Sequence, residues 1–297
     1  MKQVFFTLAV IMAVCMVSCT KEDVNAGVES DGALCGVFSV SDSVKVKFSR
    51  GNLQYQASGA VWQFSERQCD IIGMENDGIS DTYTGWIDLF GWGTSGWSSG
   101  ADAYMPYSTD LVDSHYCPGG DDSADFSGIY ANADWGRYNP IENGGNVPGM
   151  WRTLSKDEWN YLLVRRAGAA DKYALAKVDG VDGVVLLPDE WVLPEGIEFT
   201  AGVENGYKTN KYTSSKWSKM QDAGAVFLPA AGYREETTVF TRFYSDGNNE
   251  GSCGFYWSST PLSSINCNIV FFGKEKVNPQ NFSKRHFGLS VRLVKDC

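Results

Sequence analysis

The stretch Trp151-Arg-Thr-Leu-Ser-Lys-Asp-Glu-Trp159 carries the clearest structural signal in the chain. Ser155 is a residue type that caps helix N-termini, and Glu158 follows it at the three-residue spacing of a capping box. The apolar residues on either side, Leu154 and Trp159, have the positions of a hydrophobic staple, which fixes the direction in which the chain enters a helix. The stretch therefore predicts a helix that begins after Ser155 and runs to about residue 168.

Strand patterns lie on both sides of this helix. Upstream, Val44–Phe48 alternates apolar and polar residues, and Leu53–Tyr55 and Val61–Phe64 follow it as a hairpin pattern. Downstream, a hairpin is predicted around Asp179-Gly180, because Asp-Gly favours the tight turn between antiparallel strands. A second helix fits residues 214–223. Four further strands are predicted at residues 225–228, 255–258, 268–272 and 289–294. Helices and strands in this arrangement indicate an α+β fold.

Residues 73–150 keep neither a helical nor a strand period for long. Gly, Asp, Ser and Asn dominate this region, and aromatic residues are scattered through it. Aromatic side chains must pack against other groups, so the region is predicted to form long ordered loops that cover a core.

The composition excludes several classes of protein. The 297 residues carry 25 Lys and Arg against 36 Asp and Glu, which gives a formal net charge of −11. Most of such a surface would repel a nucleic acid, because binding phosphates needs clustered Lys and Arg. Only two histidines, His115 and His286, are present, which argues against a metal site built from several histidines. We therefore predict no nucleic-acid partner, no metal and no cofactor.

The first residues have the pattern of an export signal. Lys2 is followed by an apolar run over Val4–Val17, shorter than the about 20 residues that cross a bilayer. Ser18 then precedes Cys19 as in a bacterial lipobox. We expect a signal peptide over residues 1–18 and a lipid on Cys19, which would be the only attachment to a membrane.

The rest of the chain divides into two parts. Residues 19–35 are polar and acidic and are expected to form a flexible tether. No linker composition or repeat follows, so residues 36–297 are expected to form a single domain.

Five short motifs follow one another in the C-terminal half. They are Trp151-Arg-Thr-Leu-Ser-Lys-Asp-Glu-Trp159, Leu186-Leu-Pro-Asp189, Ala225-Val-Phe-Leu-Pro-Ala-Ala-Gly232, Tyr256-Trp-Ser-Ser-Thr260 and Gly288-Leu-Ser-Val-Arg-Leu-Val294. In this order they resemble exported paralogous lipoproteins of Bacteroidetes and Fibrobacter with a C-type-lectin-like fold. That group is similar to formylglycine-generating enzyme and to the variable proteins of diversity-generating retroelements. The resemblance implies a twisted, mostly antiparallel sheet with two helices and long irregular loops.

In that fold the first and last strands pair antiparallel, which would bring the start of the domain close to its end. Cys35 and Cys297 occupy these two places. The resemblance therefore implies a disulfide between Cys35 and Cys297, while the pairing of the other cysteines stays open.

The resemblance also places a ligand-binding face between Tyr256 and Arg292, the segment that is diversified in retroelement variable proteins. We expect this face to bind a glycan or a protein, with sequence diversification as a further expectation. The candidate ligand-binding residues are Ser263, Ser264, Asn266, Asn268, Lys274, Lys276, Asn278, Gln280, Asn281, Lys284 and His286. Phe271, Phe282 and Phe287 would add apolar anchors. The stretch 274–286 is also basic, which favours an acidic partner.

Two other functions stay open at this point. A structural subunit of a cell-surface assembly would expose a large apolar patch. A formylglycine-generating-type oxidase would hold copper between two close cysteines, and Cys253 and Cys267 are the candidates here, because thiolates suit Cu(I). A structural role for these two cysteines is the simpler interpretation. We therefore expect a non-enzymatic outer-membrane lipoprotein, without catalytic residues, that faces the cell surface or the periplasm.

Overall fold

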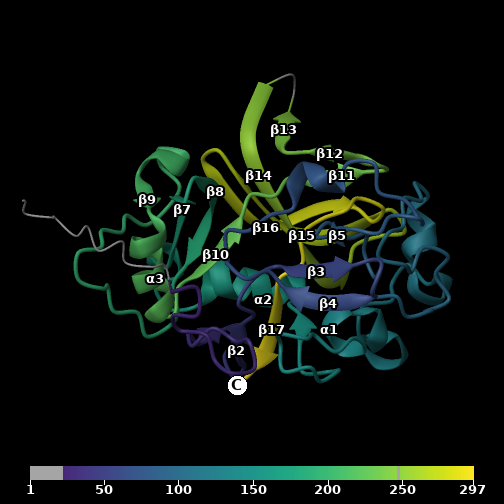
Figure 1. Cartoon of the computed structure of the whole chain (residues 1–297), viewed down its shortest axis with the longest axis horizontal. Coiled ribbons are helices and arrows are strands. Elements are labelled where there is room, and N and C mark those ends of the chain that lie inside the picture. Colours follow the sequence, from purple (N-terminus) through teal and green to yellow (C-terminus); the bar gives the residue numbers. More distant parts are fainter. Residues whose placement is uncertain (1–22, 246–247) are drawn as a thin grey trace, which may run out of the picture.

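The protein is built from small, mostly antiparallel sheets with few helices, which is an α+β architecture (Figure 1). The computed structural model describes residues 23–245 and 248–297. The predicted signal peptide over residues 1–18 and the predicted lipid site Cys19 lie outside the described residues. Within the described part of the chain, no helix is both long and apolar enough to cross a membrane.

The described strands form five sheets. The sheet at the ends of the chain has the order β1 (Phe38–Ser39), β2 (Lys45–Phe48), β17 (Leu293–Asp296), β6 (Arg152–Thr153). The second has the order β10 (Val226–Pro229), β8 (Val181–Leu186), β7 (Tyr173–Val178), β9 (Asn210–Tyr212). The third has the order β13 (Arg242–Ser245), β14 (Asn248–Pro261), β15 (Asn266–Gly273), β16 (Lys276–Lys284). The others are β4 (Val61–Phe64), β3 (Leu53–Gln56), β5 (Trp86–Ile87) and the pair β11 (Tyr233–Glu235), β12 (Thr238–Phe240).

The helices are short. The α-helices among the described residues are α1 (Trp135–Tyr138), α2 (Lys156–Asn160) and α3 (Ser214–Asp222). A π-helical turn, η5 (Tyr161–Arg165), continues α2. The 3₁₀ turns are η1 (Gly73–Asn76), η2 (Asp113–Tyr116), η3 (Pro118–Gly120), η4 (Gly128–Ala133), η6 (Ala169–Asp171) and η7 (Gly206–Lys208).

The start and the end of the fold meet in the first of these sheets. β2 pairs antiparallel with β17, and Val294 lies opposite Phe48. Both side chains are fully buried. The start of the domain therefore lies beside its end, as the resemblance implied, although the strand that pairs with β17 is β2 and not the first strand, β1.

The capping box of the central motif is present. The Ser155 hydroxyl accepts a bond from the Glu158 N–H, and the Glu158 carboxylate accepts one from the Ser155 N–H. The helix is shorter than predicted, because it changes to π-helical geometry at Tyr161 and ends at Arg165. The buried Arg166 guanidinium ends it by donating from Nε to the Leu162 carbonyl at 2.7 Å.

The predicted hairpins and the second helix are also found. β4 has the predicted bounds and pairs with β3, and β7 pairs with β8. Asp179 and Gly180 join β7 to β8 with φ angles of 48° and 88°, the left-handed geometry that a two-residue Asp-Gly turn favours. α3 ends one residue earlier than predicted, at Asp222, before the turn at Gly224.

The two central strands of the third sheet separate two cores. The side chains of Trp257 and Ile269, which lie opposite each other, pack into one core. Those of Tyr256 and Val270, the next pair, pack into the other. Because both faces are covered, β14 and β15 contain continuous apolar runs instead of an alternating pattern.

Residues 73–150 form long loops, as predicted, interrupted by β5, α1 and short 3₁₀ turns. Their aromatic side chains include Phe90, Trp92 and Trp135, which are completely buried in the first of the two cores. These loops therefore belong to the folded body and do not act as a linker.

Two expectations about the chain are wrong. The segment predicted as a tether packs on the fold from residue 24 onward: Ala33 and Leu34 are completely buried, and the Leu34 N–H donates to the Phe48 carbonyl at 2.8 Å. The disulfide expected between Cys35 and Cys297 is absent, and both residues are free cysteines. Cys35 Sγ instead lies 3.4 Å from the carbonyl oxygen of Asp222 at the end of α3.

β16 is the main element that the sequence pattern did not predict. Besides Phe282, its exposed positions carry Lys and Gln, its partly exposed positions include two Asn, and Pro279 lies in its middle. Lys, Asn and Pro are residue types that are depleted in strands. It is an edge strand, paired only with β15 among the described residues. Lysines, a proline and the register shift opposite Ile269–Phe271 are features that protect such an edge from pairing with another chain.

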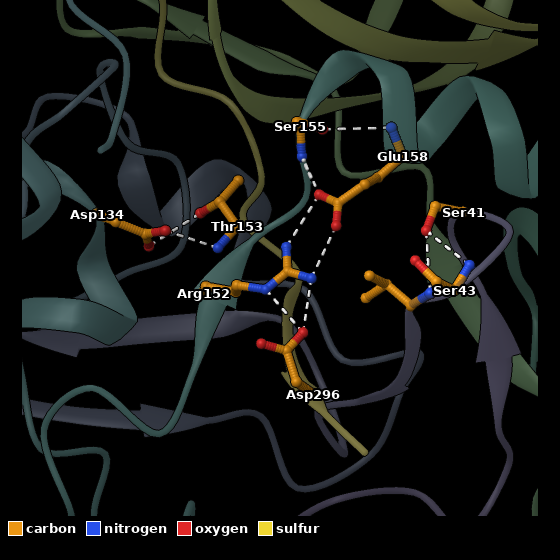
Figure 2. Close-up of polar contacts among 9 residues, drawn as sticks. Ser41, Ser43, Asp134, Arg152, Thr153, Ser155, Glu158 and Asp296 are labelled. Carbon is orange, nitrogen blue, oxygen red and sulfur yellow. Dashed lines mark hydrogen bonds and ion pairs between the residues drawn. The ribbon is translucent and has the colours of Figure 1, made fainter. Parts of the chain in front are cut away.

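Arg152, from the central motif, has a structural role. Its guanidinium donates to both oxygens of Glu158, at 2.9 and 2.7 Å, and to Asp296 at the end of β17 (Figure 2). Burial alone would lower the pKa of Arg152, but these carboxylates outweigh burial and raise it above its ordinary value. The residue therefore ties the start of α2 to the last strand.

Candidate functional site

The predicted ligand-binding face follows β16 and the turns at its two ends. Lys274, Lys276, Gln280 and Lys284 are exposed. The partly exposed members of the set are Ser263, Ser264, Asn266, Asn278 and Asn281. Lys274 and Lys276 lie in or beside the β15–β16 turn, whereas Lys284 lies opposite Asn266 near the β14–β15 turn. At the about 3.3 Å rise of a strand residue, the two ends of this face lie about 25–30 Å apart.

Two residues of the set do not face solvent. Asn268 is only 5% exposed, and its amide donates to the carbonyl oxygens of Thr260 and Pro261 at 3.2 and 3.0 Å. His286 is only 4% exposed, and its Nδ1 lies 2.9 Å from Asp113 Oδ1. Both side chains hold neighbouring loops, so the prediction that they contact a ligand is wrong.

The basic character of this segment is smaller than predicted, because Arg285 is completely buried. Its guanidinium lies 4.6 Å from the Trp92 ring centroid and donates to the carbonyl oxygens of Ser263 and Asp122. It ties the β14–β15 turn to the acidic loop after η3.

The three predicted apolar anchors differ in exposure. Phe271 is buried, and Phe287 stacks on Tyr233 with the ring centroids 5.2 Å apart. Phe282 alone is exposed, at 57%, and two other exposed apolar residues, Leu262 and Ile265, lie in the β14–β15 turn. Exposed apolar side chains therefore lie toward the end of β16 that is remote from Lys274.

The described chain contains no cluster of three or more His, Cys, Asp or Glu side chains that is suited to a metal ion. Cys253 lies opposite Gly273 at one end of β15, and Cys267 lies opposite Pro261 at the other end. Six residues of extended strand separate these two positions, which is about 20 Å. The two cysteines named for copper therefore cannot share one ion.

A basic pocket of about 480 Å³ opens at the Lys274 end of the face. Its walls come from the β7–β8 hairpin, the segment around η7, β9, the β13–β14 strands and the β15–β16 turn, which reaches toward β8 (Figure 1). The basic side chains that line it are Lys177, Lys208, Lys211, Arg242 and Lys274, and the acidic ones are Asp182 and Glu275. This is a concentration of positive charge on a chain whose net charge is −11.

The positive charge of the pocket is only partly neutralised. On the sheet surface, Lys177 lies between Asp182 on β8 and Lys211 on β9, and forms an ion pair with Asp182. Lys208, Lys211 and Arg242 form no ion pair with any residue that the structure describes. An anion that enters the pocket would therefore meet at least three cations whose charge no described acidic residue compensates.

One wall of the pocket is fixed by Tyr207. Its hydroxyl donates to the Ser252 carbonyl at 2.8 Å and so joins η7 to β14. Burial raises the pKa of Tyr207 well above its ordinary value, so the phenol stays neutral. The pocket can accept negative charge without a competing phenolate.

Two residues of the pocket have left-handed backbone conformations. Asn205 and Lys274 both line it and have φ angles of 63° and 46°, in the left-handed region that disfavours residues other than glycine. Asparagine tolerates this conformation, so the strain lies mainly at Lys274, and strained residues of this kind cluster at functional sites.

Most of this pocket could not be found from the sequence. Lys274 is its only member in the predicted set, and Lys276 lies just outside its lining. The other cations lie on segments that meet only through the parallel pairing of β7 with β9 and the packing of the β15–β16 turn. The close spacing of Lys208, just before a short strand, and Lys211, within it, is the one local signal.

Comparison of the chain with family models, with curated proteins and with solved structures found no match.

Proposed function

We propose that this protein is a non-enzymatic binding protein that holds an acidic ligand in the basic pocket at the Lys274 end of its C-terminal face. The observation that carries this proposal is the lining of the pocket, in which five basic side chains stand against two acidic ones. A pocket of about 480 Å³ is within the range of small-ligand sites, which run from about 300 to 1,000 Å³.

Electrostatics supports an acidic ligand over a neutral one. The overall charge of −11 repels anions at long range, but this repulsion is screened beyond about 8–10 Å at physiological salt. Inside the pocket the nearest charges dominate. An acidic group there would be attracted by Lys208, Lys211 and Arg242.

The setting of this pocket is part of the proposal. The lipobox before Cys19 supports export and a lipid anchor at the outer membrane, on the cell surface or on its periplasmic side. The antiparallel pairing of β2 with β17 and the positions of α2 and α3 support the C-type-lectin-like fold. The basic pocket lies outside most of the segment that the resemblance marks as diversified, so ligand binding here does not need diversification.

Charge reversal in the pocket tests the proposal. The double variant Lys208→Glu/Lys211→Glu is expected to lower the affinity for the best acidic probe about 30-fold, because two attractive charges become repulsive. The probes are oligogalacturonate, a chondroitin sulfate oligosaccharide and polyglutamate, measured by calorimetry at 50 and 300 mM NaCl.

Lys216→Glu/Lys219→Glu is the matched control. It makes the same charge change on exposed residues of α3 that do not line the pocket. The control is expected to bind like the unchanged protein. Equal weakening by both double variants, or no binding of any acidic probe, would contradict the proposal.

A further inference from the structure

A second recess of about 230 Å³ lies beside the basic pocket. The two share Lys177 and Lys211, which are cross-strand neighbours on β7 and β9. The second recess extends from this pair to Asp179 and Gly180 in the β7–β8 turn and to Thr213 before α3. A ligand that crosses the two lysines therefore occupies both recesses, whereas a single small group fills only one.

The acidic residue of the second recess is partly neutralised. Asp179 accepts from Arg67 Nη1 at 2.9 Å, and Arg67 also binds Asp70 through Nε. The charge that a ligand meets in this recess is therefore mainly that of Lys211, because Lys177 is paired with Asp182. Both recesses favour negative charge, so the ligand that fits them carries acidic groups at more than one point along its length.

The lining of the recesses favours a sugar chain over a protein segment. Protein interfaces are anchored by aromatic and apolar side chains that enter pockets. None of the exposed large apolar residues of the described chain lines either recess. The hydroxyls of Tyr207 and Tyr212, which also line the recesses, already donate to the Ser252 and Glu198 carbonyls. The remaining neutral polar groups are small ones, the amide of Asn205 and the hydroxyls of Ser252 and Thr213. Such groups suit a ligand with many hydroxyls.

We infer that the ligand of this protein is an acidic glycan chain, a run of uronic-acid sugars whose carboxylates contact the lysines and whose hydroxyls contact the small polar groups. This inference rests on the proposed function and adds two statements to it. The ligand is a glycan, and it is bound as a chain of several sugars across the Lys177–Lys211 pair.

Chain length is the first test. Galacturonate, digalacturonate and tetragalacturonate are titrated into the protein by calorimetry, with tetraglutamate as the acidic peptide of matched charge. Tetragalacturonate is expected to bind at least about 10-fold more tightly than digalacturonate, because only the longer chain reaches the second recess. Tetraglutamate is expected to bind at least about 10-fold more weakly than tetragalacturonate.

Asp179→Asn is the second test. Asparagine tolerates the left-handed conformation of this turn position, and the change removes one negative charge from the second recess. It is expected to strengthen tetragalacturonate binding about three-fold and to leave digalacturonate binding unchanged. Asp171→Asn makes the same charge change at an exposed residue that lines neither recess, and it is expected to change neither affinity.

The outcomes separate this inference from the proposed function. If tetraglutamate or another anion binds as tightly as tetragalacturonate, or if affinity does not rise with chain length, the inference is overturned. The proposed function still stands in those cases provided that Lys208→Glu/Lys211→Glu weakens binding. If uronates of every length bind independently of Lys208 and Lys211, both are overturned.

Discussion

Replacing Arg292 with alanine is expected to lower the free energy of unfolding by about 3–5 kcal/mol. Arg292 is only 1% exposed and lies between parts of the chain that are far apart in sequence. Its Nη2 donates to Gln68 Oε1 at 2.8 Å, and its Nη1 lies 3.4 Å from both Asn52 Oδ1 and the Phe227 carbonyl oxygen. Alanine would remove these bonds and leave a cavity of nearly the whole side chain.

The charge of Arg292 makes a second variant informative. Burial lowers the pKa of Arg292 to about 9, and no described carboxylate forms an ion pair with it. Arg292→Met keeps most of the volume and removes a desolvated charge, so it is expected to cost only about 1–2 kcal/mol. Urea unfolding of both variants measures these values. A loss below about 1 kcal/mol for alanine would show that Arg292 does not hold these segments together.

Replacing Asp88 with asparagine is expected to stabilise the protein above pH 7 and to have little effect near pH 4. Asp88 is only 1% exposed, and burial raises its pKa from 3.8 to about 6. Its Oδ2 accepts from the Ile72 N–H at 2.8 Å, but Oδ1 has no partner among the described residues. Asparagine keeps the useful acceptor and places a neutral amide where the ionised carboxylate is poorly solvated.

The sign of this pH dependence follows from proton binding. Between about pH 4 and pH 6 the folded protein holds the Asp88 proton more tightly than the unfolded chain does, so the free energy of unfolding falls as pH rises through this window. A change of pKa from 3.8 to about 6 corresponds to about 3 kcal/mol, which sets the upper limit of the gain. Urea unfolding at pH 4.5, 6 and 8 measures it.

Asp134 is the matched control for Asp88. Burial also raises its pKa to about 6, but both of its oxygens accept bonds, from the Thr153 N–H and hydroxyl and from the Gly136 N–H. Asp134→Asn must turn an N–H₂ group toward a donor, so it is expected to destabilise the protein at every pH, by about 1–3 kcal/mol. A loss of stability in Asp88→Asn at pH 8 as large as this would contradict the account of Asp88.

The sequence predicted the parts of the fold whose signals are local. The capping box at Ser155, the Asp179-Gly180 turn and the alternating strand at Val44–Phe48 each depend on residues within a few positions of one another. β16 was not predicted, because its polar residues and Pro279 give it the composition of a loop, and it becomes a strand only by pairing with β15. Long-range pairing of this kind has no local pattern.

The site was predicted less well than the fold, for the same reason. The segment around β16 was predicted as a binding face. Some of its side chains face solvent, whereas those of Asn268 and His286 are buried against neighbouring parts of the chain. The pocket itself is formed by lysines from β7, η7 and β9, which lie in a region that the prediction did not consider for binding. Only the pairing of β7 with β9 places Lys177 beside Lys211.

The most direct test of the central claim is amide hydrogen exchange of the protein with and without tetragalacturonate. The account predicts that the glycan slows exchange in residues 205–211 and 273–277, two segments that contribute side chains to the basic pocket. Slowing confined to residues 262–266 and 280–284, at the apolar end of β16, would contradict it. So would exchange that is the same throughout the chain at a glycan concentration where calorimetry detects binding.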